Sequence, residues 1–140
     1  MRTHYNKDGR NVTTGFLTKG AFVTPLSSFL NRRPATYTLE TLEPTTLYRI
    51  HYDDLRELFR RSHVFEHVSR ESTLDSLAAL ESRLYALQFY LAQERYENFL
   101  TQFPDLVNRI SLTHVASYLG ISPETLSRIR ANLTNVKQKR

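Results

Sequence analysis

The N-terminal third of the chain has the pattern of short β-strands. Between residues 11 and 51 the chain is rich in Thr, Tyr, Phe and Val, which favour strands. It is interrupted by three prolines, Pro25, Pro34 and Pro44. These predict turns, with two of the strands covering residues 36–43 and 45–51. The Asp8-Gly9 pair predicts a further hairpin, because glycine adopts a positive φ without steric cost.

From Tyr52 onward the apolar positions take a helical period. Leu55 and Leu58 have helical spacing, and the two aspartates before them favour the start of a helix. Between residues 71 and 91 leucines then recur at the a and d spacing of a coiled coil. They are Leu77, Leu80, Leu84, Leu87 and Leu91. We expect a leucine seam between two copies of the chain; the alternative is one amphipathic helix packed on its own β domain.

The last third of the chain predicts three helices. The first covers residues 93–103 and ends at Pro104. The second has Ser111 as its N-cap and ends at Gly120, which supplies a left-handed conformation. Its apolar face consists of Leu112, Val115, Ala116 and Leu119. The third begins at Ser122-Pro123, an N-cap followed by proline at the first helical position.

The second and third of these helices have the pattern of a helix-turn-helix. A small residue, Ala116, stands where two tightly crossing helices approach, and Gly120 lies in the turn. The apolar residues that would hold the crossing angle are Val115, Leu119, Ile121, Leu126 and Ile129. The alternative is an ordinary helical hairpin without a ligand.

Polar side chains on the outward face of the third helix favour the helix-turn-helix. They are Glu124, Ser127 and Arg128. Glutamate can accept a hydrogen bond from cytosine, and arginine can donate two to a guanine edge in the major groove. We therefore take these three residues as candidates for reading DNA bases.

Charge supports a polyanionic partner, and composition excludes several classes of site. The 140 residues carry 19 Lys and Arg against 14 Asp and Glu. Residues 105–140 hold six Lys and Arg against two Asp and Glu. Candidate phosphate contacts in this basic segment are Arg130, Lys137 and Lys139. The chain has no Cys, which excludes disulfides and thiolate metal sites, and no run approaches the about 20 apolar residues of a membrane span.

Three segments resemble the Crp/Fnr family of bacterial transcription regulators. Residues 120–128 (Gly-Ile-Ser-Pro-Glu-Thr-Leu-Ser-Arg) resemble its recognition helix, and residues 93–104 resemble the first helix of its DNA-binding domain. Residues 20–35 resemble the later part of its cyclic-nucleotide-binding-like β-roll. The likeness extends over roughly residues 5–133.

The resemblance implies an α+β fold with a partial antiparallel β-roll, a long dimerisation helix and a C-terminal helix-turn-helix domain of winged-helix type. It implies a homodimer through the central helix, which residues 71–87 match. In the family the positions of Glu124, Ser127 and Arg128 read bases, and the position of Ser111 contacts a phosphate.

Two departures from the family bear on the β-roll. Family members carry a longer β-roll, so we expect the first strands to be missing, as in a short gene product or a fragment. Nucleotide-binding members place a Gly-Glu pair in the loop after the position of Phe22, whereas Thr24-Pro25 stands here. Arg33 remains a candidate phosphate ligand, but Pro34 beside it offers neither hydroxyl nor N–H. These changes argue against binding of a cyclic nucleotide.

A small metallopeptidase is an alternative that rests on one short motif. Residues 63–67 spell H-x-x-E-H, in which His63 and His67 would share one face of a helix and could bind zinc. The motif has no evident third ligand, and no nucleophile–base pair accompanies it. We therefore expect no enzymatic activity, no metal and no cofactor.

The sequence predicts a cytoplasmic, dimeric, sequence-specific DNA-binding transcription regulator. Residues 1–52 would form the partial β-roll, residues 53–91 the connecting and dimerisation helices, and residues 92–140 the DNA-binding domain. Double-stranded DNA and a second copy are the expected partners, with a small-molecule effector of unknown identity and no membrane. The alternative from another class is a β-roll dimerisation or interaction module that has lost DNA binding.

Overall fold

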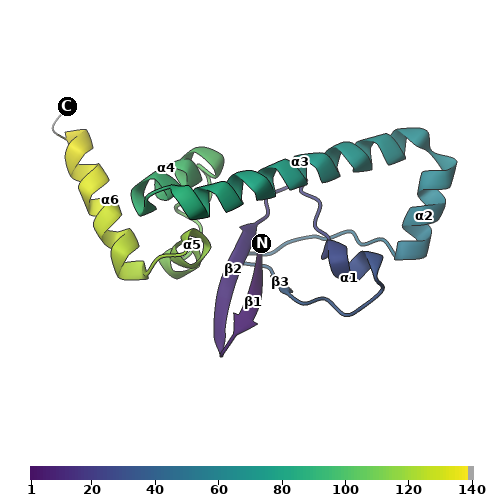
Figure 1. Ribbon diagram of the computed structural model, residues 1–140, viewed down its shortest axis with the longest axis horizontal. Helices are drawn as coiled ribbons and strands as arrows, with labels where there is room; N and C mark the ends of the chain where they lie inside the picture. The colour runs from purple at the N-terminus through teal and green to yellow at the C-terminus, as the bar shows by residue number, and fades with distance from the viewer. Residues whose placement is uncertain (139–140) are drawn as a thin grey trace.

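The computed structural model describes residues 1–138, with side chains up to residue 134. Within them lie three strands, β1 (Arg2–Lys7), β2 (Arg10–Phe16) and β3 (Thr38–Glu40). The helices are α1 (Leu26–Leu30), α2 (Tyr52–Arg61), α3 (His63–Phe89), α4 (Ala92–Gln102), α5 (Leu112–Leu119) and α6 (Pro123–Gln138). The fold is of the α+β class. The long helix α3 spans the molecule, with α1 and α2 towards one end, α4 to α6 at the other, and the sheet beside it (Figure 1).

Strands β1 and β2 form the hairpin that Asp8-Gly9 predicts. The strands are antiparallel, and Lys7 and Arg10 are the last pair before the turn. Asp8 has φ 52° and Gly9 has φ 77°. Positive φ at both central residues is the geometry of a type I′ turn, whose twist matches that of the two strands.

The remaining strand prediction is largely wrong. Of residues 36–43 only Thr38–Glu40 form a strand, which pairs with the first half of β1, and residues 45–51 form none. Strand β1 lies between β2 and β3, so both of its edges are already paired. Residues 45–51 join neither β1 nor the outer edge of β2 or β3, and the Tyr48 side chain is 98% exposed.

Helix α3 begins earlier than the leucine pattern predicts and also ends earlier. Ser62 caps it by accepting a hydrogen bond from the Phe65 N–H at 3.2 Å, and the helix ends at Phe89. Leu91 therefore lies beyond α3, where its N–H donates to the Glu94 carboxylate at 2.7 Å. Its expected place in one continuous helical seam is wrong, because the chain reverses at this point to begin α4.

The hydrophobic core lies among α4, α5, α6 and strand β2. Its buried apolar residues are Phe16, Tyr96, Phe99, Leu106, Val115, Ala116, Leu119 and Leu126. Phe16 of β2 reaches into it, with its ring centroid 5.9 Å from that of Phe99 and 5.2 Å from that of Tyr118. Helix α3, in contrast, contributes no buried residue.

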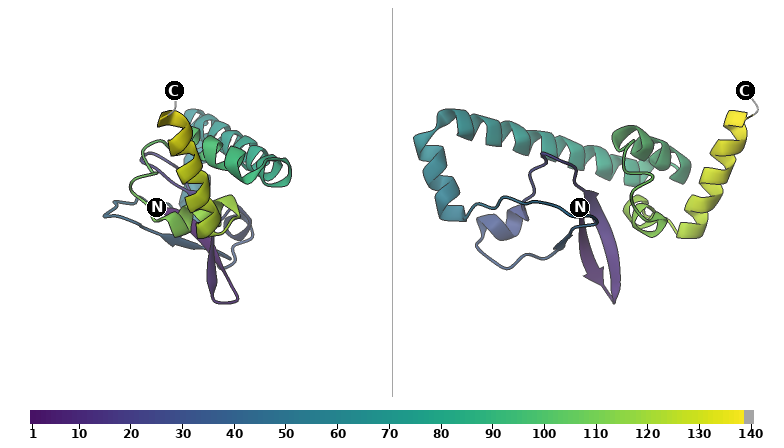
Figure 2. Two further views of the ribbon diagram at one scale, coloured as in Figure 1. Left: turned by 90° about the vertical axis from the view of Figure 1, so that its left-hand side faces the viewer. Right: turned by 180° about the vertical axis from the view of Figure 1, so that it is seen from behind.

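The winged-helix character expected for the C-terminal domain stays a prediction, since the described part of that domain shows no strand of a wing. Residues 92–138 contain helices and their connections, and no strand. The hairpin that packs against α5 is the N-terminal β1–β2 pair, as two opposite views agree (Figures 1 and 2). None of the helices among residues 1–138 is both long enough and apolar enough to cross a membrane.

Candidate nucleic-acid interface

Helix α5 is fixed at its start by a side-chain cap. The Ser111 side chain accepts a hydrogen bond from the His114 N–H at 3.3 Å, as the sequence predicts. From this start one face of α5 packs into the core, where Val115, Ala116 and Leu119 are buried. The position of α5 is thus fixed by its N-cap and by its buried face.

The turn between α5 and α6 depends on two small residues. Gly120 adopts the left-handed conformation, with φ 69° and ψ 34°, and its N–H donates to the Ser117 carbonyl at 3.3 Å. The Ile121 N–H donates to the Ala116 carbonyl at 3.0 Å. This pattern satisfies the last carbonyls of α5. The buried Ala116 methyl is small enough for the next helix to pass close by.

Helix α6 is anchored by one face and leaves the other free. The Ser122 side chain caps it by accepting from the Thr125 N–H at 3.2 Å, and Pro123 is its first residue. Leu126 is fully buried. Ile129 and Leu133 pack against the same core.

The candidate base-reading residues all lie on the exposed side of α6. Glu124, Ser127 and Arg128 are each exposed. The Arg128 guanidinium donates to the Thr125 hydroxyl at 3.4 Å, so it lies against the preceding turn of α6. Hydrogen bonds from the Ser122 side chain and the backbone lower the pKa of Glu124, so this carboxylate is ionised and accepts hydrogen bonds at neutral pH.

The structure describes two of the four candidate phosphate contacts. Ser111 is exposed at the start of α5, whereas Arg130 is half-buried and, two residues after Arg128, lies on another side of α6. The side chain of Lys137 and the whole of Lys139 lie outside the described residues. Of these four residues the structure describes only the side chains of Ser111 and Arg130, and the phosphate contacts stay a prediction.

The candidate effector residue Arg33 follows the short helix α1. The N–H groups of Asn31, Arg32 and Arg33 donate to carbonyls within α1, so the backbone donors of this turn are already used. Arg32 pairs with Asp53 at 2.7 Å. Among the described residues the exposed Arg33 guanidinium has no hydrogen-bonding partner, which leaves one free cationic side chain at this turn.

The leucines of the expected dimer seam are exposed in the single chain. Leu77, Leu80 and Leu84 are 61%, 62% and 56% exposed, and Leu87 is 41% exposed. Their pairing with a second copy stays a prediction. The H-x-x-E-H motif lies at the start of α3 with His63 almost fully exposed, and no group of three metal-binding side chains occurs in the described part of the chain.

Sequence reasoning missed a polar cluster between the sheet and α5. Buried Arg2 on β1 donates to the Glu40 carboxylate at 2.7 Å and to the Thr13 hydroxyl at 3.0 Å. His4 is also buried there, and His114 of α5 is near enough to interact electrostatically with Arg2. No signal in the sequence joins residues so far apart.

The N-terminal part of the chain matches a known domain family. Residues 1–62, which include the sheet, α1, Arg33 and α2, match the cyclic nucleotide-binding domain family. No curated protein matches the chain. The family match suggests a small-molecule effector and supports a cyclic nucleotide-binding-like fold for residues 1–62.

Proposed function

We propose that the protein is a dimeric, sequence-specific DNA-binding transcription regulator of the Crp/Fnr type. In this proposal α5 and α6 are a helix-turn-helix, with α6 as the recognition helix in the major groove. Residues 1–62 are the sensor or scaffold, and the protein is not an enzyme. It acts on DNA in the cytoplasm.

The observation that carries the proposal is the two-sided character of α6. Its inner face is fixed by the fully buried Leu126, and its outer face exposes Glu124, Ser127 and Arg128 together. Helix α6 stands at one end of the molecule, away from the sheet, where a DNA duplex can approach it (Figures 1 and 2). A rigid helix with hydrogen-bonding side chains on its free face is what reading of base edges requires.

The exposed leucines of α3 support a homodimer. A helix of 27 residues without a buried side chain carries apolar surface that a single chain leaves in water. Pairing of two α3 helices through Leu77, Leu80, Leu84 and Leu87 would bury that surface. The two recognition helices would then be related by a two-fold axis, with half-sites about one helical turn (~34 Å) apart.

Selection of DNA sites from a random pool tests the proposal. The purified full chain should enrich a site with two-fold symmetry. The same selection with Arg128→Ala should lose the preference at one base position of each half-site. A matched control is Arg60→Ala, because Arg60 is an exposed arginine on α2, far from α6 in Figure 1. No enrichment with the wild-type chain contradicts the proposal.

A dimerising interaction module without DNA binding is the second candidate. It is favoured by exposed aromatic and aliphatic side chains in the family-matched segment, where Phe22 is 72% and Leu47 58% exposed. Large apolar side chains left in water are of the kind that association with a partner buries. The two candidates differ in the selection experiment, since the module would form dimers and enrich no DNA site.

A further inference from the structure

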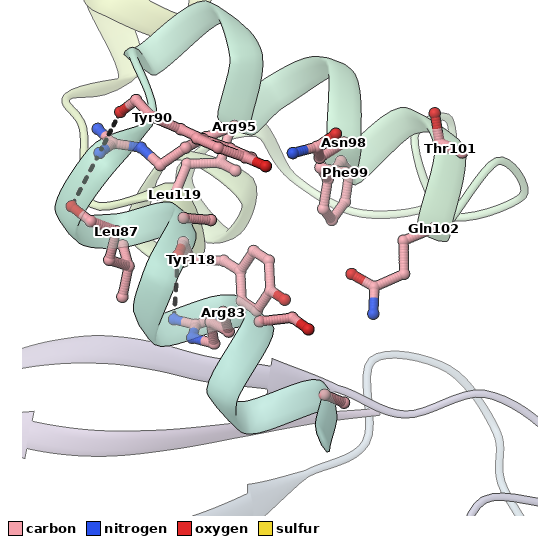
Figure 3. A pocket seen from close by; sticks show the side chains of 13 residues that line it. Arg83, Leu87, Tyr90, Arg95, Asn98, Phe99, Thr101, Gln102, Tyr118 and Leu119 are labelled. Atoms are coloured by element: carbon pink, nitrogen blue, oxygen red, sulfur yellow. Dashed lines mark hydrogen bonds between the residues drawn. The ribbon is translucent and has the colours of Figure 1, made fainter. Parts of the chain in front are cut away.

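A cavity of about 380 Å³ lies between α3, α4 and α5, apart from the proposed DNA-reading face of α6. Figure 3 shows two arginines at this cavity, Arg83 from α3 and Arg95 from α4. Tyr118 of α5 lies against Arg83 (Figure 3). The volume lies in the range of sites for small organic molecules.

Arg83 is held in place without a counter-ion. Its guanidinium lies 3.8 Å from the centre of the Tyr118 ring, and its Nη2 donates to the Tyr118 carbonyl at 3.1 Å. Its Nη1 is buried and has no acceptor. Burial lowers the pKa of Arg83, because the charged form has lost water without gaining a carboxylate.

Arg95 is in a similar position on the next helix. Its Nη1 donates to the carbonyls of Leu87 and Tyr90 at 3.4 and 3.3 Å, at the end of α3. Its Nε is buried and has no acceptor. Each arginine therefore joins two elements while one of its own N–H groups remains unsatisfied, which is costly for a buried donor.

The rest of the lining suits an anion. Among the described residues that line the cavity there is no Asp or Glu. The neutral polar groups there are hydroxyls and amides, from Ser82, Asn98, Thr101 and Gln102 among others, and all of them can donate hydrogen bonds. Two partly buried guanidinium groups, each with one buried N–H that has no acceptor, would be stabilised by a negative group in the cavity.

The cavity borders the proposed dimer seam. At about 100° per residue, the side of α3 that carries Ala79, Arg83 and Ala86 is turned by roughly 120° from the side that carries Leu80 and Leu84. Leu87 belongs both to the seam and to the lining of the cavity, so a second copy packed on the leucines would lie at the Leu87 edge of the site.

We propose that the cavity between α3, α4 and α5 binds a small organic anion through Arg83 and Arg95. Phosphate and carboxylate groups share the chemistry required, since both accept charge-assisted hydrogen bonds from guanidinium. This site is separate from the turn that carries Arg33 in the family-matched segment. It does not depend on DNA binding.

Titration calorimetry of the full chain with inorganic phosphate and with citrate, at constant ionic strength, tests this site. We expect saturable binding of at least one of the two, with one site per chain; the preferred anion identifies the recognised group. Arg95→Gln should weaken binding at least tenfold. Arg60→Gln, which removes the same charge from the exposed surface of α2, should leave binding unchanged.

Arg83→Gln should weaken binding as Arg95→Gln does. If circular dichroism shows that this variant does not fold, Arg83→Lys keeps the charge but loses the planar fork, and should still bind at least tenfold more weakly. Absence of saturable binding with both anions overturns the proposal. Equal affinity of wild type and Arg95→Gln overturns it as well.

Discussion

The backbone N–H of Thr13 donates a hydrogen bond to the Ser117 side-chain oxygen at 2.9 Å, joining β2 to α5 across 104 residues of sequence. Ser117 in turn donates to the Asn11 carbonyl at 3.4 Å. Strand β2 lies in the segment that matches the cyclic nucleotide-binding domain family, and α5 supports the proposed recognition helix. The family-matched segment is therefore hydrogen-bonded directly to the helix that precedes α6.

Ser117→Ala tests the strength of this contact. The variant leaves the N–H of Thr13, a fully buried residue, without its acceptor. The free energy of unfolding should fall by about 1–3 kcal/mol in a urea titration. Ser127→Ala, on the exposed face of α6, should change it by less than about 0.5 kcal/mol. Equal stability of the two variants would show that the contact contributes nothing.

The polar cluster beside this contact predicts a dependence of stability on pH. Burial lowers the pKa of His114, and the charges of Arg2 and His4 lower it further, against the opposing effect of Glu40. The folded protein then binds this proton less readily than the unfolded chain. Stability should fall as the pH decreases below about 6.5, the pKa of an unfolded histidine.

His114→Gln provides the test of that pH dependence. The test compares urea midpoints at about pH 7.5 and about pH 5.5, roughly one unit on either side of the pKa of an unfolded histidine. Between these two pH values the midpoint of the wild type should fall more than that of the variant. His63→Gln removes a histidine whose side chain is 97% exposed, so its urea midpoint should change with pH as that of the wild type does. If the urea midpoint of His114→Gln changes with pH as much as that of the wild type, the acid sensitivity belongs to other groups.

The turn before α6 depends on a left-handed residue. A Cβ added to Gly120 would meet its nearest neighbour, the Leu87 Cδ2, at 3.6 Å, an ordinary contact. The cost of Gly120→Ala is therefore conformational, and we expect a loss of about 1–2 kcal/mol in thermal or urea unfolding. Gly120→Asn should lose less, since Asn tolerates this conformation better. A larger loss of stability in Gly120→Asn than in Gly120→Ala would contradict this explanation.

The leucine seam is tested by placing a charge within it. Leu84→Asp should convert a dimer into a monomer in sedimentation experiments, because an unpaired carboxylate would be buried between the helices. Val68→Asp is a matched control, as Val68 is an exposed apolar residue on nearly the opposite side of α3. A wild-type chain that sediments as a monomer at micromolar concentration would refute the seam.

Local signals in the sequence predicted local structure well. The caps at Ser111 and Ser122, the left-handed Gly120 and the Asp8-Gly9 turn each depend on a few neighbouring residues, and all of them form. Prediction failed where structure depends on distant partners. The segment around Tyr48 has strand propensity, but whether it forms a strand depends on pairing with a strand elsewhere in the chain, and it pairs with none of β1, β2 and β3.

The candidate sites differ in the same way. Glu124, Ser127 and Arg128 were found because a helical period places them on one face. Arg83 and Arg95 were not found, because they come together only when α3 reverses into α4. Leu91 was misplaced for the same reason, since the heptad continues in the sequence through a point where the helix ends.

Competition binding of Arg128→Ala to the selected DNA site and to a scrambled duplex tests the central claim most directly. If α6 reads bases, Arg128→Ala should lose about 1–3 kcal/mol of binding free energy on the selected site and much less on the scrambled one. Arg60→Ala should bind both duplexes as the wild type does. Equal weakening of Arg128→Ala on both duplexes would make Arg128 a phosphate contact and contradict the assignment of α6 as the recognition helix.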